Sequence, residues 1–504
     1  MSFLYENAVV MYTALVISLM AWIFGGTRAE LLLPVVPWLV FFLWEMMLCF
    51  PQRRAGESLN GTRHRVWKEM RRDPLTWTAL GFMILLAVPF VNNGLCPVCD
   101  YEKITLGINP DPPVKFLPFC VDRLHHLNVF EWFAVALSVM VAVKHSLRRR
   151  GKRLLVEMLV WNGAALAVLG FVQSAAGASG PFWAELPGGR KAGDFFSSFG
   201  YPNMAGDYFT TVFALAVAAW HRRRGDVLEE IAASEAADLK DRRGMFWRKH
   251  FFLLPAVVCF FAALNTLSRA SIILVTVLAA LFFVYTFIAF TARKPKAFRI
   301  KVGVWSAIAL GVVLFFSSVF MPENFRREVN TLDSAAVLDR VTGKGQYHVR
   351  VATEIWKEYP LFGCGGWGYR HFCIPKMTEA EYKDIQQVGG INVHNDYLQF
   401  LAEHGTVGFG AILAMVVLLC WPIGVAWNAL MKAVRFAKPK DLPPKPVQLF
   451  VMPAPVFFIA AAVVATFIHG FGDCPLRSPA VLSLFFAALA AMPGYIPKLN
   501  LEKE

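Results

Sequence analysis

Two arginines and one histidine are the residues of this sequence best suited to transfer chemistry. Arg269 stands in Thr-Leu-Ser-Arg-Ala between two apolar runs, Arg350 stands in Tyr-His-Val-Arg, and His394 opens His-Asn-Asp-Tyr-Leu. Arginine stays charged and offers a planar fork of donors that matches diphosphate oxygens. Histidine can accept a hydroxyl proton near neutral pH. Together they have the functional groups for transfer from a lipid diphosphate to a hydroxyl acceptor.

Each of these residues also has a simpler interpretation. Arg269 is typical of an interfacial side chain whose charge reaches the membrane surface. Arg350 has Glu354 four residues later, which is the spacing of a helix-surface ion pair. His394 alone fits a structural histidine. The glycine run 363–368 indicates a turn or a close-packed element, because no strand–helix context for a nucleotide loop surrounds it.

The composition excludes an ordinary soluble enzyme, a coiled coil and a disordered chain. The 504 residues are 56% hydrophobic and only 17% charged, against about 25% charged residues in an average soluble domain. The apolar residues gather in runs about as long as the roughly 20 residues that cross a bilayer. The sequence therefore predicts an all-α polytopic integral membrane protein.

Twelve runs of mostly apolar residues predict about 12 transmembrane helices, since each span must satisfy its own backbone hydrogen bonds in lipid. They lie near residues 8–25, 31–50, 76–93, 128–144, 154–175, 205–220, 251–268, 271–290, 302–320, 406–426, 451–469 and 480–496.

The positive charges predict the orientation of these spans. With both termini in the cytoplasm, 33 of the 50 lysines and arginines fall in inside segments, as the positive-inside rule requires. Basic clusters at 148–150 and 222–224 then face anionic lipid of the inner leaflet. Membrane lipid accounts for the net charge of +14, and no recognition module supports a nucleic-acid partner.

Three predicted outer segments, 94–127, 176–204 and 321–405, are too long for simple turns. Six of the nine cysteines lie on this side, which permits disulfides such as Cys364–Cys373 and a pair from the 94–120 region. Cys96-Pro-Val-Cys99 is not completed by a second cysteine or histidine pair, so no metal site is predicted. The ionisable residues Glu45, Glu131 and Glu157 fall near predicted span ends, which disfavours an ion-coupled transporter.

Several motifs resemble the O-antigen ligase family, which includes ligases that attach O-antigen to lipid A core, polysaccharide polymerases and protein O-oligosaccharyltransferases. The resemblance covers about 195–495 and is most specific at 350–408. It rests on these motifs: Gly200-Tyr-Pro-Asn203-Met-Ala205; Ser268-Arg269-Ala270, where the family more often has glycine at the last position; Arg350 with Trp356; Pro360-Leu-Phe-Gly363-x-Gly365; His394-Asn395-x-x-Leu398; Glu403-x-Gly405-x-x-Gly408; and Gly472-Asp473.

The resemblance implies a GT-C-like glycosyltransferase of a bacterial inner membrane, with a periplasmic active site. It implies that Arg269 and Arg350 hold the undecaprenyl diphosphate of the glycan donor and that His394 is catalytic. Substrate-binding roles are implied for Asn203, Asn395, Glu403 and Asp473. The implied reaction is inverting and needs neither metal nor cofactor. Its acceptor hydroxyl is carried by lipid A core, a glycan or a protein, and the sequence does not choose among them.

The chain is predicted to comprise N-terminal membrane helices over 1–193, an O-antigen-ligase-like membrane region over 194–496, and a cytoplasmic tail over 497–504. The partly helical periplasmic loop 321–405 carries the catalytic motifs. Two other classes of function remain open, a transporter or flippase of lipid-linked glycans and a non-catalytic assembly scaffold.

Overall fold

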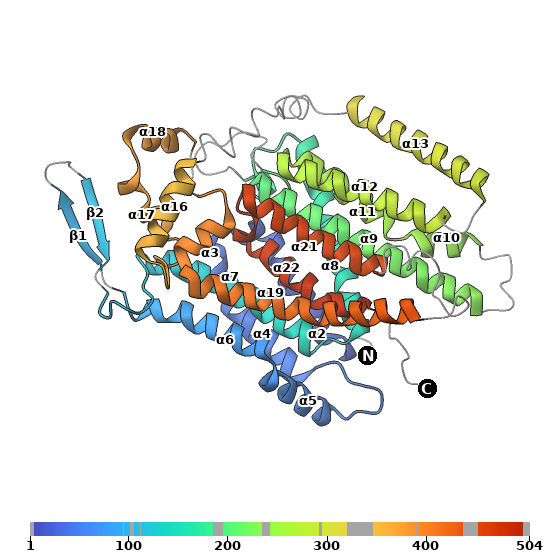
Figure 1. The fold of residues 1–504 in the computed structure, drawn as a ribbon, viewed down its shortest axis with the longest axis horizontal. Coiled ribbons are helices and arrows are strands. Elements are labelled where there is room, and N and C mark those ends of the chain that lie inside the picture. Colours follow the sequence, from blue (N-terminus) through green and yellow to red (C-terminus); the bar gives the residue numbers. More distant parts are fainter. Residues whose placement is uncertain are drawn as a thin grey trace. The chain divides into compact units, whose positions relative to one another are not determined.

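The computed structural model describes residues 5–93, 95–100, 105–110, 112–184, 195–233, 242–291, 295–319, 346–388, 392–436 and 452–496. Its elements are helices apart from one two-stranded ribbon (Figure 1). The predicted helical membrane fold is thereby confirmed. The predicted tail 497–504 and the first part of the predicted outer loop, 321–345, lie outside the described residues.

The chain divides into two compact units, each built from several stretches of sequence. The first comprises Met1–Arg148, Ser334–Leu419 and Thr466–Ala490. The second comprises Arg149–Asp333, Cys420–Ala465 and Ala491–Glu504. Two of the boundaries fall inside long helices, α19 (Asp396–Phe436) and α21 (Ala454–Gly472).

The first unit begins with apolar helices and ends with the elements that carry the motifs predicted to be catalytic. Before the first boundary it contains α2 (Ala8–Trp22), η1 (Phe24–Gly26), α3 (Ala29–Leu32), α4 (Val36–Cys49), α5 (Leu59–Arg72), α6 (Pro74–Ala87), η2 (Val88–Phe90), β1 (Leu95–Asp100), β2 (Thr105–Pro110) and α7 (Arg123–His145). It then contains α16 (Gln346–Glu358), α17 (Tyr369–Phe372), η5 (Ile374–Lys376), α18 (Glu379–Val388), the first part of α19, the end of α21, η6 (Pro475–Arg477) and α22 (Pro479–Ala491).

The second unit is built from helices alone in the part that the structure describes. They are α8 (Arg149–Ala175), η3 (Pro181–Trp183), α9 (Pro202–Ala233), α10 (Arg242–His250), α11 (Leu253–Asn265), α12 (Arg269–Thr291), α13 (Lys296–Val319), the remaining parts of α19 and α21, and η7 (Met492–Tyr495).

Each of the twelve predicted runs coincides with a helix, but fewer meet the length expected of a span. Among the residues that the structure describes, six helices are long and apolar enough to cross a membrane, or seven if the bent pair Leu59–Arg72 and Pro74–Phe90 is one span. Shorter apolar helices occupy three more runs, at Ala8–Trp22, Val36–Cys49 and Pro479–Tyr495. Helix α7 begins five residues before the predicted run, so Glu131 lies within this helix and is buried.

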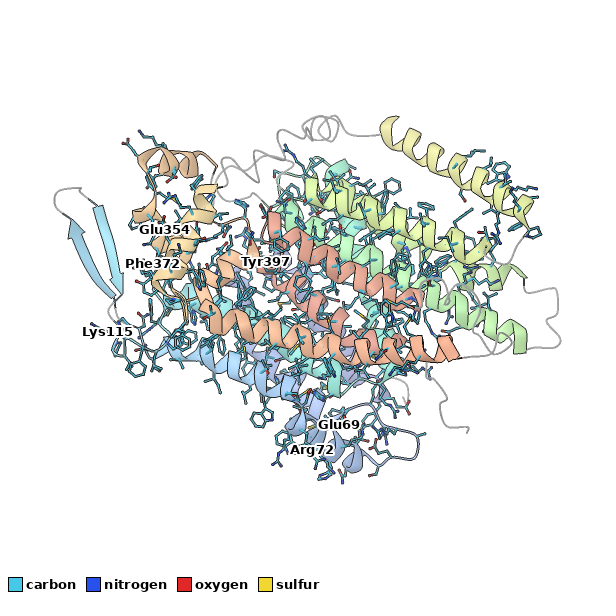
Figure 2. The ribbon with its side chains drawn as sticks, viewed as in Figure 1. Glu69, Arg72, Lys115, Glu354, Phe372 and Tyr397 are labelled. Carbon is cyan, nitrogen blue, oxygen red and sulfur yellow. The ribbon has the colours of Figure 1, made fainter. Side chains whose placement is uncertain are left out.

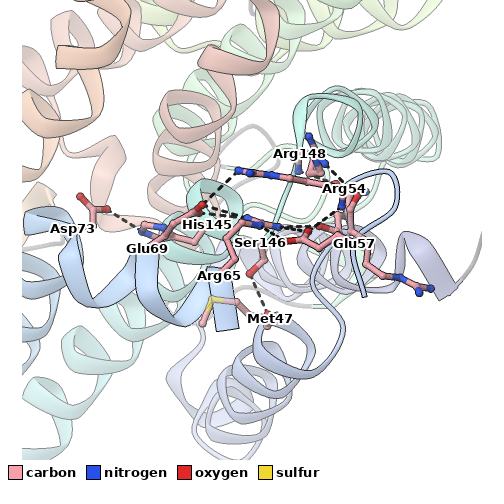
Figure 3. Close-up of polar contacts among 11 residues, drawn as sticks. Met47, Arg54, Glu57, Arg65, Glu69, Asp73, His145, Ser146 and Arg148 are labelled. Atoms are coloured by element: carbon pink, nitrogen blue, oxygen red, sulfur yellow. Dashed lines mark hydrogen bonds and ion pairs between the residues drawn. The ribbon is translucent and has the colours of Figure 1, made fainter. Parts of the chain in front are cut away.

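Helix α5 meets α6 at a bend of 68°, and a polar network surrounds the bend (Figure 3). Asp73 accepts a hydrogen bond from the Leu75 amide, which satisfies one free amide at the start of α6. Its other oxygen lies 2.8 Å from Lys144 Nζ and 2.9 Å from His145 Nε2 at the end of α7. Pro74 follows at the first helical position, where its missing N–H costs no hydrogen bond.

The predicted outer loop 94–127 contains the two strands. Strand β1 pairs antiparallel with β2 from Leu95 opposite Pro110 to Asp100 opposite Thr105. Both strands are edges of a two-stranded ribbon, and an edge tolerates Pro97 and Pro110, whose nitrogens cannot donate to a ladder.

The 346–388 segment packs around a small hydrophobic core in the first unit, to which residues before and after the segment also contribute. Figure 1 shows α16, α17 and α18 grouped near the start of α19. The core consists of Phe119, Val121, Val351, Ala352, Ile355, Cys364, Tyr369, Phe372, Cys373, Val393 and Ala402. Cys364 and Cys373 are both free thiols within it, and Cys120 is also a free, buried thiol. Because both thiols are free, the predicted Cys364–Cys373 disulfide is wrong. The two side chains instead pack as small apolar groups in this core.

Candidate functional site

His394 and Asp473 form a close pair across 79 residues of sequence. His394 Nδ1 lies 3.4 Å from Asp473 Oδ1, and the histidine side chain is 43% exposed while the aspartate side chain is 8% exposed. His394 has φ of 52°, in the left-handed region that L residues rarely adopt. Such backbone strain is characteristic of functional sites. A histidine that donates Nδ1–H to a carboxylate keeps the lone pair of Nε2 for a proton.

Asp473 is held by its own neighbours as well as by His394. Its Oδ1 accepts hydrogen bonds from the Cys474 amide at 2.7 Å and from the Cys474 thiol at 3.3 Å. Burial alone raises the pKa of this carboxyl, but the hydrogen bond and charge of His394 outweigh burial and lower the pKa to about 2. Asp473 is therefore an anion at neutral pH, fixed in position beside the histidine.

The start of α19 attaches the His394 loop to the end of α21. Asn395 Oδ1 accepts from the Leu398 amide at 3.0 Å, which caps α19, while its Nδ2 donates to the Phe471 carbonyl at 3.2 Å. Asp396 accepts from the Leu476 amide, and Tyr397, labelled in Figure 2, donates its hydroxyl to the Phe467 carbonyl at 2.6 Å. Asn395 and the two residues that follow it, Asp396 and Tyr397, therefore set the position of His394 relative to Asp473.

Helix α16 contributes a second histidine to this site. His348 is buried, its Nδ1 lies 3.0 Å from the Tyr369 hydroxyl, and its ring centroid lies 6.1 Å from that of His394. Sequence reasoning missed His348, although it stands two residues before Arg350 in a quoted motif.

Arg350 is bound by two carboxylates. It lies 3.0 Å from Glu354 on α16, which Figure 2 labels, and 2.9 Å from Glu381 on α18. The hydrogen bonds that Arg350 donates to Glu354 and Glu381 raise the pKa of Arg350. Two residues along an α-helix are turned by about 200°, so Arg350 leaves α16 on the face opposite His348. The predicted i, i+4 pair with Glu354 is confirmed, and with Glu381 the arginine ties α18 to α16.

Glu403 forms an ion pair in the interior of the first unit. Its carboxylate contacts Arg477 Nη2 and accepts from Gln399 Nε2 at 3.2 Å, and Glu403 is fully buried. The Arg477 guanidinium lies 4.6 Å above the Trp367 ring, and Arg370 lies 3.8 Å from the same ring. Sequence reasoning missed Arg477, which stands four residues after Asp473 and just beyond the acidic motif.

The glycine run packs against a break in α19. The Cys364 and Gly365 amides donate to the carbonyls of Ala402 and Glu403 at 3.0 and 2.9 Å. Gly405 has φ of 63° and ψ of −172° inside the helix, and a Cβ there would lie 2.2 Å from the Leu361 carbonyl oxygen. The interpretation of 363–368 as a turn and close-packing element is confirmed.

His126 fixes this turn to α7. Its Nε2 lies 2.8 Å from the Leu86 carbonyl oxygen, which can only accept, so Nε2 carries the proton. Its Nδ1 is then free to accept from the Gly366 amide at 3.0 Å. The turn is therefore held from two sides, by α19 and by α7.

The second unit brings two further motifs together. Arg269 is half-buried and begins α12, while Asn203 lies in the first turn of α9 and donates to the Tyr201 hydroxyl at 3.1 Å. A Cβ on Gly206 would lie 2.2 Å from Ser271 Oγ and 2.9 Å from Thr266 Oγ1. The Tyr-Pro-Asn and Ser-Arg motifs are therefore in close contact through α9 and α12.

A family model described as O-antigen ligase matches residues 254–413. This segment is similar to the O-antigen ligase family. The family resemblance predicted from the motifs is thereby confirmed. A search of curated proteins finds none that matches the chain.

The segment that matches the family model contains five of the seven predicted site residues. Arg269, Arg350, His394, Asn395 and Glu403 lie within residues 254–413. Asn203 precedes the matched segment and Asp473 follows it. Of the predicted residues, the first unit brings His394, Asn395 and Asp473 into one site and places Glu403 in a buried ion pair.

His394, Asp473 and Cys474 have ligand atoms within 4.8 Å of one another, a spacing within which a metal ion could be bound. Burial raises the pKa of the Cys474 thiol well above its ordinary value, and the thiolate is the form that ligates metals. The three residues therefore fit a histidine that is oriented by a carboxylate better than they fit a metal centre.

Proposed function

We propose that this protein is a membrane glycosyltransferase that moves a glycan from undecaprenyl diphosphate to an acceptor hydroxyl on the periplasmic face. The observation that carries the proposal is the exposed His394 of the segment that matches the O-antigen ligase family, held by buried Asp473. A histidine in this arrangement can accept the hydroxyl proton, and the anionic partner stabilises the imidazolium that forms. Ligation to lipid A core is the favoured reaction.

The proposed step is a single displacement. The acceptor oxygen attacks the anomeric carbon as its proton passes to His394 Nε2, and the bond from that carbon to the diphosphate oxygen breaks. The electron pair leaves with undecaprenyl diphosphate, and the configuration at the carbon is inverted. Asp473 keeps the imidazole in the tautomer whose Nε2 accepts the proton.

Arg269 and Arg350 are proposed to stabilise the charge on the departing diphosphate. Fixed positive charge at the leaving oxygen can replace a metal ion in this role, which is why the reaction is proposed to be metal-independent. Arg350 is paired with Glu354 and Glu381 in this structure, so the donor must compete with these carboxylates. We therefore expect Glu381→Gln to increase donor affinity and Arg350→Ala to decrease it.

An apolar cavity of about 120 Å³ supports a lipid-linked substrate. It is lined by aromatic side chains from α7, α19, α21 and α22, among them Trp132, Phe400, Phe467 and Phe485, and lies beside Glu403 and Arg477. A lining of this kind is compatible with a hydrocarbon chain.

Glycan transfer by the purified protein in lipid tests the proposal. An undecaprenyl-linked oligosaccharide is supplied with lipid A core, an oligosaccharide or a peptide as acceptor, with EDTA present. We expect transfer to one acceptor and a loss of at least a hundredfold in His394→Ala, because general base catalysis contributes about 10²–10⁴-fold. The acceptor used distinguishes a ligase from a polymerase or a protein O-oligosaccharyltransferase.

The same variants separate the other classes of function. A flippase predicts that Arg350→Ala weakens carrier binding while His394→Ala has no effect. A scaffold predicts that neither substitution alters binding or transfer. Intact carrier binding without transfer to any acceptor would overturn the enzymatic proposal.

A further inference from the structure

Three potential metal ligands converge between α7 and α17 in the first unit. Asp122 precedes α7, His125 lies in its first turn, and His371 lies in α17. A carboxylate oxygen and one ring nitrogen from each histidine all lie within 4.8 Å of one another, and each residue is partly buried. None of the three belongs to the His394 site described above.

The carboxylate of Asp122 is already oriented by the helix it caps. Its Oδ1 accepts from the Leu124 amide at 2.7 Å and from the His125 amide at 3.1 Å. Its Oδ2 lies 3.2 Å from His125 Nδ1. One oxygen is therefore fixed by the backbone, and the other is presented to the two histidines, as in ligands positioned by outer hydrogen bonds.

The two ring nitrogens are buried without hydrogen-bond partners among the described residues. These atoms are His125 Nδ1, whose approach to Asp122 does not have hydrogen-bond geometry, and His371 Nε2. The centroids of the two rings are 6.0 Å apart. A buried polar atom without a partner is destabilising, and one cation placed among these ligands would satisfy both nitrogens.

We propose that Asp122, His125 and His371 bind a divalent transition-metal cation, with Zn²⁺ the best match. Two imidazole nitrogens and one carboxylate oxygen form a common zinc ligand set, with water in the fourth position. Bonds of about 2.1 Å place ligand atoms at most about 4 Å apart, so binding draws the side chains closer by up to roughly 1 Å. Arg370 directly precedes His371 in the sequence, and its positive charge limits the affinity of the site for a cation.

The bound cation joins α17 to the start of α7. Helix α17 directly follows the turn that contains Gly366 and Trp367, so the metal adds a third attachment beside the contacts of this turn with α19 and His126. No ligand is shared with His394 or Asp473. Zinc is therefore expected to stabilise the 346–388 segment and to take no part in transfer.

Zinc content and thermal stability test the site directly. The full chain, purified without a histidine tag, is treated with EDTA, desalted, incubated with ZnCl₂ and desalted again before elemental analysis. Asp122→Asn keeps the helix cap, because asparagine caps about as well as aspartate, but it removes the anionic ligand. His371→Ala removes a nitrogen ligand. The matched controls are His64→Ala, an exposed histidine of α5, and His394→Ala.

We expect one zinc per chain and a raised Tm in the wild type and in both controls. Bound zinc should fall at least tenfold in Asp122→Asn and His371→Ala, and the Tm of Asp122→Asn in EDTA should equal that of the wild type. Co²⁺ should give the visible absorption of tetrahedral coordination in the wild type and in both controls, but not in Asp122→Asn or His371→Ala. Absence of zinc from the wild type, equal zinc in His371→Ala, or loss only in His394→Ala would overturn the assignment.

Discussion

The buried ion pair between Glu403 and Arg477 allows a test of whether Glu403 stabilises the fold or binds substrate. We expect Glu403→Gln, which keeps the size of the side chain and removes its charge, to destabilise the protein strongly. Glu403 is fully buried and Arg477 is 8% exposed, so the substitution leaves a buried guanidinium without its anion. Breaking a buried pair from one side costs about 3–5 kcal/mol.

Two contacts reduce this cost. The Trp367 ring 4.6 Å from Arg477 continues to stabilise the cation, a contribution of about 1–2 kcal/mol when desolvated. Glutamine also retains one acceptor oxygen for the guanidinium. The low end of the range, about 3 kcal/mol, is therefore expected. At about 2 °C per kcal/mol for a unit of this size, the Tm should fall by about 6 °C.

Glu354→Gln is the matched control, because it makes the same chemical change in an exposed pair with Arg350. Both side chains of that pair are more than 40% exposed, and exposed ion pairs contribute about 0–1 kcal/mol. Thermal unfolding of the two variants in the same detergent, at one scan rate, gives the comparison. If Glu403→Gln unfolds at the wild-type temperature and loses donor binding, Glu403 is a substrate ligand and the structural reasoning is refuted.

Two further substitutions test the backbone and the charge of the site. Gly405→Ala should destabilise the protein by more than about 2 kcal/mol, because its φ of 63° is strained for alanine and its Cβ would lie 2.2 Å from a carbonyl oxygen. Gly410→Ala, with no atom within 4 Å of the new Cβ, should not destabilise, and equal Tm values for the two would contradict this account. For Asp473, burial opposes ionisation but the His394 contact dominates, so the folded pKa of about 2 lies below the ordinary 3.8. The stabilisation, about 2 kcal/mol, is complete above the unfolded pKa and is lost as the pH falls from about 4 through 2. The wild type should therefore have a higher Tm than Asp473→Asn at pH 5 and should lose that advantage by pH 2. A difference in Tm that does not change with pH would contradict the lowered pKa of Asp473.

Local properties of the sequence predicted the helices well. A run of about 20 apolar residues has few structural options in lipid, because its backbone must satisfy its own hydrogen bonds. Each of the twelve runs accordingly has a helix, although prolines and glycines shorten several of them. The β1–β2 ribbon was not predicted, since its strands are short and include prolines.

The sequence by itself determined the class of the protein, the positions of its helices and its O-antigen ligase motifs, because composition, hydropathy and residue spacing are local properties. Only the tertiary structure decided what each polar side chain contacts. His394 and Asp473 are 79 residues apart, Glu403 and Arg477 are 74 apart, and Asp122 caps α7 whereas His371 lies in α17. Long-range pairs of this kind depend on how helices pack, and no local pattern specifies that packing.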